Sequence, residues 1–207
     1  MGTRAFFSPD AKARVRDAVA EVERQSAAEI VVALRRSSGH YRHADFIAGG
    51  LAALAALCVF LYHPEPFDFT FLPLELLGFF AAAATATAQL PGLRRALTAR
   101  RVRDENVHDA ARAFFVDRGL TRTAGRTGIL VYLSVLERRV EVVADIGVDE
   151  AALGQPWIDA KTKLDRALAA GSIDDMLAAL RGLGPILGAA LPRAEDDVNE
   201  LPDEVAS

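Results

Sequence analysis

Two long apolar segments in the first half of the chain constrain its fold more than any other feature. The first covers residues 44–62 and the second covers residues 71–90. At about 1.5 Å per helical residue, each is long enough to cross the roughly 30 Å hydrocarbon core of a bilayer. Only the short segment 63–70 lies between them. The sequence therefore predicts a transmembrane helical hairpin.

The alternative interpretation of each segment is a buried core helix of a soluble protein. Asp45 lies at the edge of the first segment, and Glu75 lies in the first turns of the second. A carboxylate near the bilayer centre costs on the order of 2.5–3.5 kcal/mol, whereas one near a helix end can reach the interface. The position of both acids near segment ends favours the membrane interpretation. The single cysteine, Cys58, lies within the first segment, so an intramolecular disulfide is impossible.

The charges that flank the segments predict an orientation. The connection between the two segments has no lysine or arginine, whereas arginines lie on both outer flanks: Arg35, Arg36, Arg42, Arg94, Arg95, Arg100, Arg101 and Arg103. Because cytoplasmic loops carry an excess of positive charge, both flanks are expected in the cytoplasm and the loop outside. The predicted location is a cell inner membrane crossed twice, with the lipid bilayer as the first partner.

The rest of the chain predicts one α/β domain that the hairpin interrupts. Residues 1–43 supply a helix and a strand, residues 44–90 the hairpin, residues 91–192 the remainder of the domain, and residues 193–207 an acidic tail. The expected strands are 29–34, 128–136 and 140–146, and the expected later helices are 93–118, 157–170 and 173–191. Ser8 before Pro9 predicts the start of the first helix, and Gly119 predicts the end of the helix before it. Ser172, with Asp175 three residues later, predicts a capping box at the start of the last helix. The fold class is a small mixed β-sheet flanked by helices. The short turn after residue 136 makes the last two strands an antiparallel hairpin, and their apolar residues place both centrally.

Candidate catalytic groups are sparse. The sequence has no phosphate-binding glycine loop, no histidine pair with zinc spacing and no nucleophile elbow. Asp145 and Asp149 lie after the third strand, where α/β folds place ligands, and two carboxylates at a turn could hold Ca²⁺ or Mg²⁺. The alternative is that Asp149 caps a helix near residue 151 and that Asp145 is solvated. No basic face with interleaved aromatic residues predicts nucleic-acid binding.

The order of these segments resembles the TPM domain family. The resemblance is carried by the strand 29–34, by the stretch from Arg122 to Gly147, by the helix at Trp157 and by residues 197–203 near the end of the chain. It is similar in particular to bacterial membrane proteins in which a transmembrane hairpin interrupts this domain. The resemblance implies the fold and the membrane location. Some family members have been called acid phosphatases, and acidic residues near the sheet edge have been linked to Ca²⁺.

Two functions of different classes follow as hypotheses. The first is a non-enzymatic cytoplasmic module that binds or supports other membrane or envelope proteins. The second is a weak metal-dependent acid phosphatase that uses the corner formed by Asp145 and Asp149. Phosphatase action would need a nucleophile or a metal-activated water, and the sequence identifies neither. The complete fold without a catalytic set favours the first hypothesis.

Overall fold

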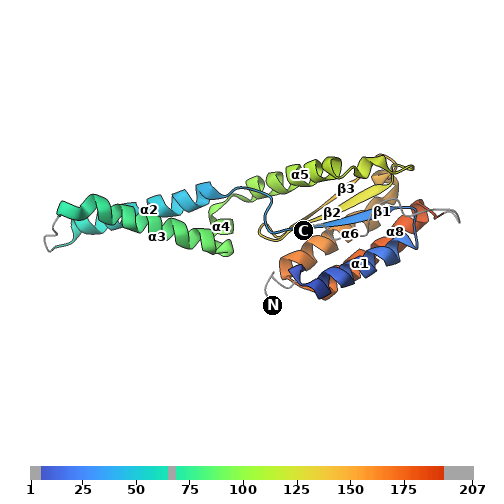
Figure 1. The fold of residues 1–207 in the computed structure, drawn as a ribbon, viewed down its shortest axis with the longest axis horizontal. Coiled ribbons are helices and arrows are strands. Elements are labelled where there is room, and N and C mark those ends of the chain that lie inside the picture. The colour runs from blue at the N-terminus through green and yellow to red at the C-terminus, as the bar shows by residue number, and fades with distance from the viewer. Residues whose placement is uncertain (1–5, 65–68, 194–207) are drawn as a thin grey trace. The chain divides into compact units, whose positions relative to one another are not determined.

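The structure of the chain, a computed structural model, describes residues 6–64 and 69–193 (Figure 1). They belong to two compact units, of which the first combines the chain up to residue 38 with the chain from residue 104 onward. The second unit covers residues 39–103. The predicted acidic tail, apart from its first residue, and the central part of the predicted external loop lie outside the described residues.

The first unit is built around a three-stranded mixed sheet in the order β1-β2-β3. The strands are β1 (Glu29–Arg35), β2 (Gly128–Ser134) and β3 (Arg139–Ala144). β1 pairs parallel with β2, so the predicted joining of the early strand to the later two is confirmed, as is the antiparallel β2–β3 hairpin. The prediction that β3 is central is wrong. β3 carries Glu141 and is only partly buried, and it forms an edge of the sheet.

Helices cover both faces of this sheet (Figure 1). The helices of the first unit are α1 (Pro9–Glu23), α5 (Arg100–Asp117, which begins in the second unit), α6 (Glu150–Ala170), α7 (Ile173–Arg181) and α8 (Leu183–Ala190), with the short 3₁₀ turn η3 (Leu120–Arg122). Even-numbered residues of β1 and odd-numbered residues of β2 pack against α1, α6, α7 and α8. The alternate residues pack against α5. This period-two alternation, with both faces apolar, explains why β1 and β2 read as continuous apolar runs.

Helix ends follow local sequence signals. Ser8 caps α1 through a 3.1 Å bond from the Ala11 amide, and Gly119 follows α5 with φ of 69°. Ser172 caps α7 by accepting from the Asp175 amide, as predicted. The backbone N–H of Ser172 donates to the Ala167 carbonyl instead, so the structure shows only this half of the predicted capping box.

The two predicted helices that follow β3 have different extents in the structure. The last one is divided into α7 and α8 at Gly182. α6 begins at Glu150 rather than at Trp157, and it contains a kink at Gly154, whose φ of 59° and ψ of −145° are not helical. Glycine adopts that backbone conformation without a Cβ penalty, and Pro156 follows it. A single turn capped by Asp149 therefore precedes the predicted helix.

The second unit consists of helices and their connections. These are α2 (Arg42–Tyr62), the 3₁₀ turn η2 (Phe69–Phe71), α3 (Leu72–Gln89) and α4 (Pro91–Leu97). The prediction of one continuous helix over 93–118 is wrong, because α4 ends before α5 begins. Thr98 is extended, and its hydroxyl donates to the Arg94 carbonyl, which competes with continuation of the helix. The residue before Pro91 is also extended, as proline requires, so α3 and α4 are bent by 106°.

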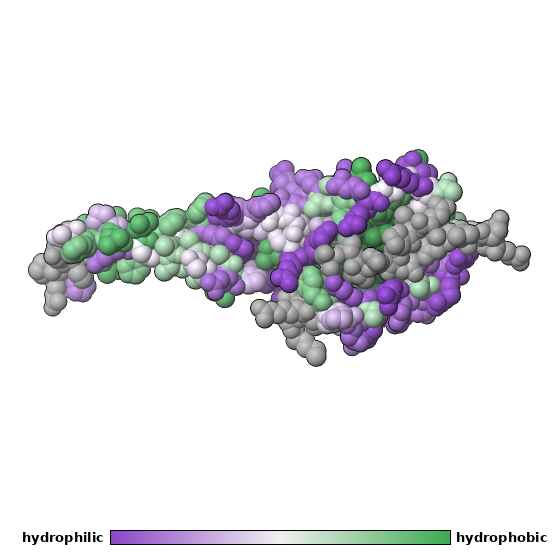
Figure 2. Space-filling model, in the orientation of Figure 1, coloured by the Kyte–Doolittle hydropathy of each residue, from purple (hydrophilic) through white to green (hydrophobic). Residues whose placement is uncertain are grey.

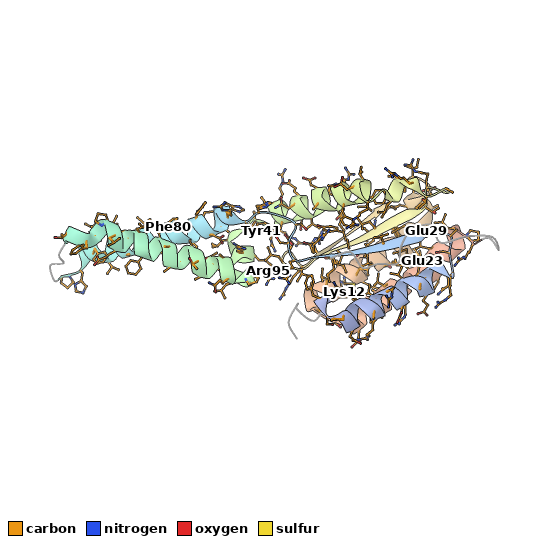
Figure 3. The ribbon with its side chains drawn as sticks, viewed as in Figure 1. Lys12, Glu23, Glu29, Tyr41, Phe80 and Arg95 are labelled. Atoms are coloured by element: carbon orange, nitrogen blue, oxygen red, sulfur yellow. The ribbon has the colours of Figure 1, made fainter. Side chains whose placement is uncertain are left out.

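α2 and α3 pack against each other and direct most of their large side chains outward. A Cβ added to Gly49 would lie 2.7 Å from the Phe80 ring, so glycine permits a close approach of the two helices (Figure 3). Leu54 is 56% exposed, and Leu51, Val59, Leu61, Leu74 and Leu77 are similarly exposed (Figure 2). By length and composition, α2 could cross a membrane, whereas α3 meets the same test only together with α4.

Candidate functional site

The predicted acidic corner is closed by an ion pair. Asp145 is 5% exposed and accepts two hydrogen bonds from Arg126, from Nε at 2.6 Å and from Nη2 at 2.9 Å. It also accepts from the Ile146 amide at 2.8 Å. The Arg126 guanidinium lowers the pKa of this carboxyl, against the opposing effect of burial and with help from the Ile146 amide. The expectation that Asp145 is solvated is therefore wrong.

The loop that carries Arg126 is held tightly against this corner. The Gly147 amide donates to the Arg126 carbonyl, and a Cβ on Gly147 would lie only 2.2 Å from the Gly125 carbonyl oxygen. Arg126 itself has a positive φ of 53°. The sequence predicts a turn over residues 125–128 but not the pairing of Arg126 with Asp145. The sequence did carry a signal for this pair. Arg126 lies in the turn before β2, and β2 is the neighbour of β3, the strand that Asp145 follows.

Asp149 has a structural role in the same loop. Its carboxylate accepts from the amides of Ala151 and Ala152 at 3.0 and 3.2 Å, so it caps the first turn of α6. The capping interpretation is therefore confirmed. Within residues 6–64 and 69–193, no group of three or more histidine, cysteine, aspartate or glutamate side chains could hold a metal ion. A cation at this corner would have to displace Arg126 from Asp145, so the residues present do not fit a preformed metal site.

We expect Ca²⁺ or Mg²⁺ at millimolar concentration to shift the melting temperature of the detergent-solubilised protein by less than about 1 °C. The reason is that the bound guanidinium already neutralises Asp145. Thermal unfolding followed by circular dichroism checks this, with Asp145→Asn and Asp149→Asn as controls. A larger stabilisation that both substitutions abolish would establish the predicted metal site instead.

A second polar cluster lies at the carboxyl end of the central strand, and sequence reasoning missed it. Glu137 is 2% exposed, and it accepts from the Ser134 hydroxyl at 2.5 Å and from the Ser38 amide at 2.9 Å. The hydroxyls of Ser38 and Ser134 are also 2.5 Å apart. The cluster ties Ser38, which lies just after β1, to the end of β2. Its signal in the sequence was a glutamate three positions after a strand-ending serine.

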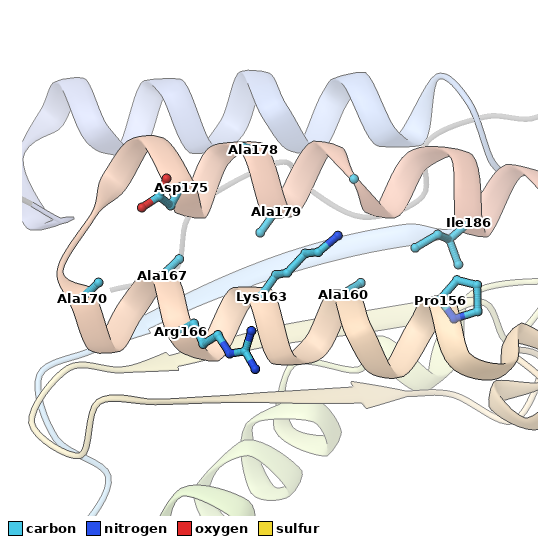
Figure 4. A pocket seen from close by; sticks show the side chains of 11 residues that line it. Pro156, Ala160, Lys163, Arg166, Ala167, Ala170, Asp175, Ala178, Ala179 and Ile186 are labelled. Atoms are coloured by element: carbon cyan, nitrogen blue, oxygen red, sulfur yellow. The ribbon is translucent and has the colours of Figure 1, made fainter.

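A groove of about 510 Å³ runs between α6 and the pair α7–α8 (Figure 4). Its floor is made of small apolar side chains: Ala160, Ala167, Ala170, Ala178 and Ala179. Lys163, Arg166 and Asp175 also line it, and neither of the two cations has an ion-pair partner within the described part of the chain. An apolar floor with charged side chains of both signs beside it is suited to an apolar segment that also carries polar or charged groups.

The second unit contains an ion pair between α2 and α4. The Asp45 carboxylate accepts from Arg94 Nε at 2.9 Å and from Nη2 at 2.6 Å, which is the bidentate geometry of a strong charge-assisted pair. The Asp45 side chain is 11% exposed and that of Arg94 is 27% exposed. The acid at the edge of the first apolar segment is thus neutralised, and the pair ties the beginning of α2 to α4.

Comparisons with known proteins give information on the fold alone. No family model matches the chain, and no curated protein matches it. Among solved structures, the chain is similar to the NMR structure of the BA42 protein from the psychrophilic bacterium Bizionia argentinensis, with a TM-score of 0.58. The sequences are 14% identical, and the similarity covers 96% of this chain and 93% of that chain.

Proposed function

We propose that the chain is an integral protein of a bacterial inner membrane and that its α/β unit acts by binding other membrane or envelope proteins rather than by catalysis. In this proposal α2 and the broken pair α3–α4 cross the bilayer, and both termini lie in the cytoplasm. The relationship to the TPM domain family belongs to the same proposal, and the resemblance of the strand and turn sequences supports it.

The outward-facing apolar surface of α2 and α3 is the observation that carries the membrane proposal. Only Ala44, Asp45 and Gly49 of α2 are buried, whereas a core helix of a soluble protein buries its large apolar side chains. A contiguous apolar surface of this kind marks a lipid or protein contact. The Asp45–Arg94 pair removes the one formal charge of α2 that lies within its apolar segment.

Two features of the first unit support a binding role. Its acidic corner is occupied by Arg126 and by a helix cap, so the carboxylates that could have served chemistry have structural partners. The groove between α6 and α7 offers an apolar floor beside Lys163 and Arg166, neither of which has an ion-pair partner among the described residues, and such a floor is suited to recognition. The phosphatase hypothesis would need the cation that the corner, as folded, does not accommodate.

The topology is tested by cysteine labelling in intact cells. In a Cys58→Ala background, Asp68→Cys is expected to react with a membrane-impermeant maleimide, whereas Val116→Cys, on the exposed surface of α5, reacts only after permeabilisation. The charge asymmetry of the flanks is the physical reason. Labelling of Val116→Cys alone in intact cells would reverse the topology, and loss of the protein from the membrane fraction at high pH would contradict the proposal of membrane spans.

The binding role is tested by affinity capture of the tagged full-length protein from crosslinked membranes. A partner that is recovered reproducibly, and is lost in a Lys163→Ala/Arg166→Ala variant, would support binding through the groove. The matched control is Arg112→Ala, an exposed arginine on α5. Hydrolysis of a phosphate monoester by the purified protein, abolished by Asp145→Asn, would instead support the phosphatase hypothesis.

A further inference from the structure

The backbone groups of β3 alternate between the sheet and the open edge. The Asp145 amide donates inward to the Gly128 carbonyl, which makes this pair a hydrogen-bonded pair of the antiparallel ladder. Hydrogen-bonded pairs recur at every second residue, so the N–H and C=O groups of Val140, Val142 and Ala144 point away from β2. They form the free edge of the sheet.

Only one end of this edge is capped. The Val140 amide donates to the Asp165 carboxylate at 3.0 Å, which covers that donor from α6. In the part of the chain that the structure describes, the outward groups of Val142 and Ala144 have no partner. The opposite edge of the sheet, formed by β1, differs from the β3 edge because the residues of β1 are buried along nearly its whole length. Exposed edge groups of this kind are a template for pairing with another strand.

A groove of about 430 Å³ runs beside this edge, between β3 and α6. Its lining combines Val142 and Ile158 with polar and charged side chains, among them Lys161, Thr162 and Asp165, and Ile158 is 52% exposed. A strand added to β3 would direct every second side chain toward α6, so an apolar side chain there would cover Ile158. The exposed Ile158 beside Val142 therefore favours an alternating segment that directs an apolar side chain toward this part of α6.

The helices over β3 exclude a second copy of this chain from the edge. Asp165 of α6 reaches around to the outward amide of Val140, so α6 extends over the edge on one face. On the other face, His108 of α5 bonds Glu141 at 2.8 Å. Two paired edges lie about 4.8 Å apart, whereas packed helices need about 8–10 Å between axes. A second copy would bring its own helices into this space, but an extended peptide would not.

We propose that the free edge of β3 binds an extended peptide segment of a partner protein by antiparallel strand addition, with apolar residues of that segment covering Ile158. The proposal deepens the binding role given above and rests on it, because it assigns the partner a conformation and a place on the α/β unit. Main-chain hydrogen bonds to Val142 and Ala144 supply the affinity, and the groove between β3 and α6 selects the side chains of the bound peptide.

The direct test uses a synthetic peptide of about seven residues, in which valine and threonine alternate between terminal lysines. In an antiparallel pair, the residues whose side chains face α6 are also those whose N–H groups point at β3. N-methylation of the valines is therefore expected to weaken binding about tenfold or more, and N-methylation of the threonines to leave it unchanged. Fluorescence anisotropy with the full-length protein in detergent micelles measures both.

Two variants of the protein make the test independent of the peptide chemistry. Val142→Pro removes an outward N–H and leaves the ladder to β2 intact, so the peptide is expected to lose most of its affinity. Asp165→Ala uncovers the Val140 amide, lengthens the free edge and is expected to tighten binding. Amide exchange of Val142 and Ala144 should slow when the peptide binds.

The outcomes separate this proposal from the membrane function. Equal affinity of the two N-methylated peptides, or an unchanged affinity for Val142→Pro, would overturn strand addition. Failure of the unmodified peptide to bind at millimolar concentration would overturn it as well. None of these results would alter the membrane topology measured by cysteine labelling, so the two proposals fail separately.

Discussion

Replacement of Trp157 by alanine is expected to lower the free energy of unfolding of the α/β unit by about 3–5 kcal/mol. Trp157 is 1% exposed and belongs to the core between the sheet and α6. Its indole N–H donates to Glu150 at 2.7 Å, and the Lys161 ammonium lies 5.4 Å from the ring centroid. The substitution creates a cavity and removes the donor to a charged group, so both losses have the same sign.

Trp157 is the only tryptophan, so its replacement removes the tryptophan fluorescence signal. Unfolding of the protein in urea must therefore be followed by circular dichroism. Trp157→Phe is the matched control, since it keeps most of the volume and is expected to lose only about 1–2 kcal/mol. Burial alone would raise the pKa of Glu150, and hydrogen bonds from Lys161 and Trp157 turn the net shift downward. An alanine variant as stable as the phenylalanine variant would show that the ring volume contributes little.

Arg94→Gln is expected to destabilise the second unit by about 3 kcal/mol, because it leaves the largely buried Asp45 carboxylate without its counter-charge. The bidentate pair also holds the beginning of α2 against α4. The variant should therefore begin to lose its helical signal at a lower denaturant concentration than the unmodified protein. Unfolding of the detergent-solubilised protein by sodium dodecyl sulfate, monitored by helical ellipticity, measures the change.

The double variant Asp45→Asn/Arg94→Gln separates pairing from simple loss of side chains. Replacing both charged groups removes the uncompensated carboxylate, so the double variant should be more stable than Arg94→Gln alone. If the loss of stability in the double variant equals the sum of the losses in Asp45→Asn and in Arg94→Gln, the ion pair at the base of α2 contributes no coupling free energy. In that case the bend after α3 would rest on Pro91 and the extended residue before it.

Local signals predicted most of the elements of the fold, because each is decided by neighbouring residues. Ser8 before Pro9, Gly119 after α5 and Ser172 before α7 lie where helix ends were expected. The edge position of β3 was not predictable from its apolar residues, since strand order depends on the pairing of β1 with the far side of β2. The division at Thr98 depends on one side-chain hydrogen bond that competes with the helix.

The candidate sites were harder to predict than the elements. Position after a strand singled out Asp145 as a candidate metal ligand, but in the structure its carboxylate is paired with Arg126, nineteen positions earlier in the sequence. The buried cluster at Glu137 and the capping of Val140 by Asp165 likewise join residues from different elements. Such contacts follow from packing. The sequence marks an arginine in a turn and a glutamate after a strand, but it does not specify which partner each of them will meet.

The parallel pairing of β1 with β2 has a consequence for the order of events during synthesis. Glu29 pairs with Gly128, so the first strand leaves the ribosome long before its partner does. A long flexible connection closes at a cost that grows only about 0.6 kcal/mol per doubling of length. Once Asp45 has paired with Arg94, the flexible part of the chain between β1 and β2 is effectively shorter. The loss of conformational entropy when β1 pairs with β2 is then smaller. Early folding of the inserted helices should therefore accelerate completion of the sheet, whereas their delay would leave β1 exposed as an apolar strand without a partner.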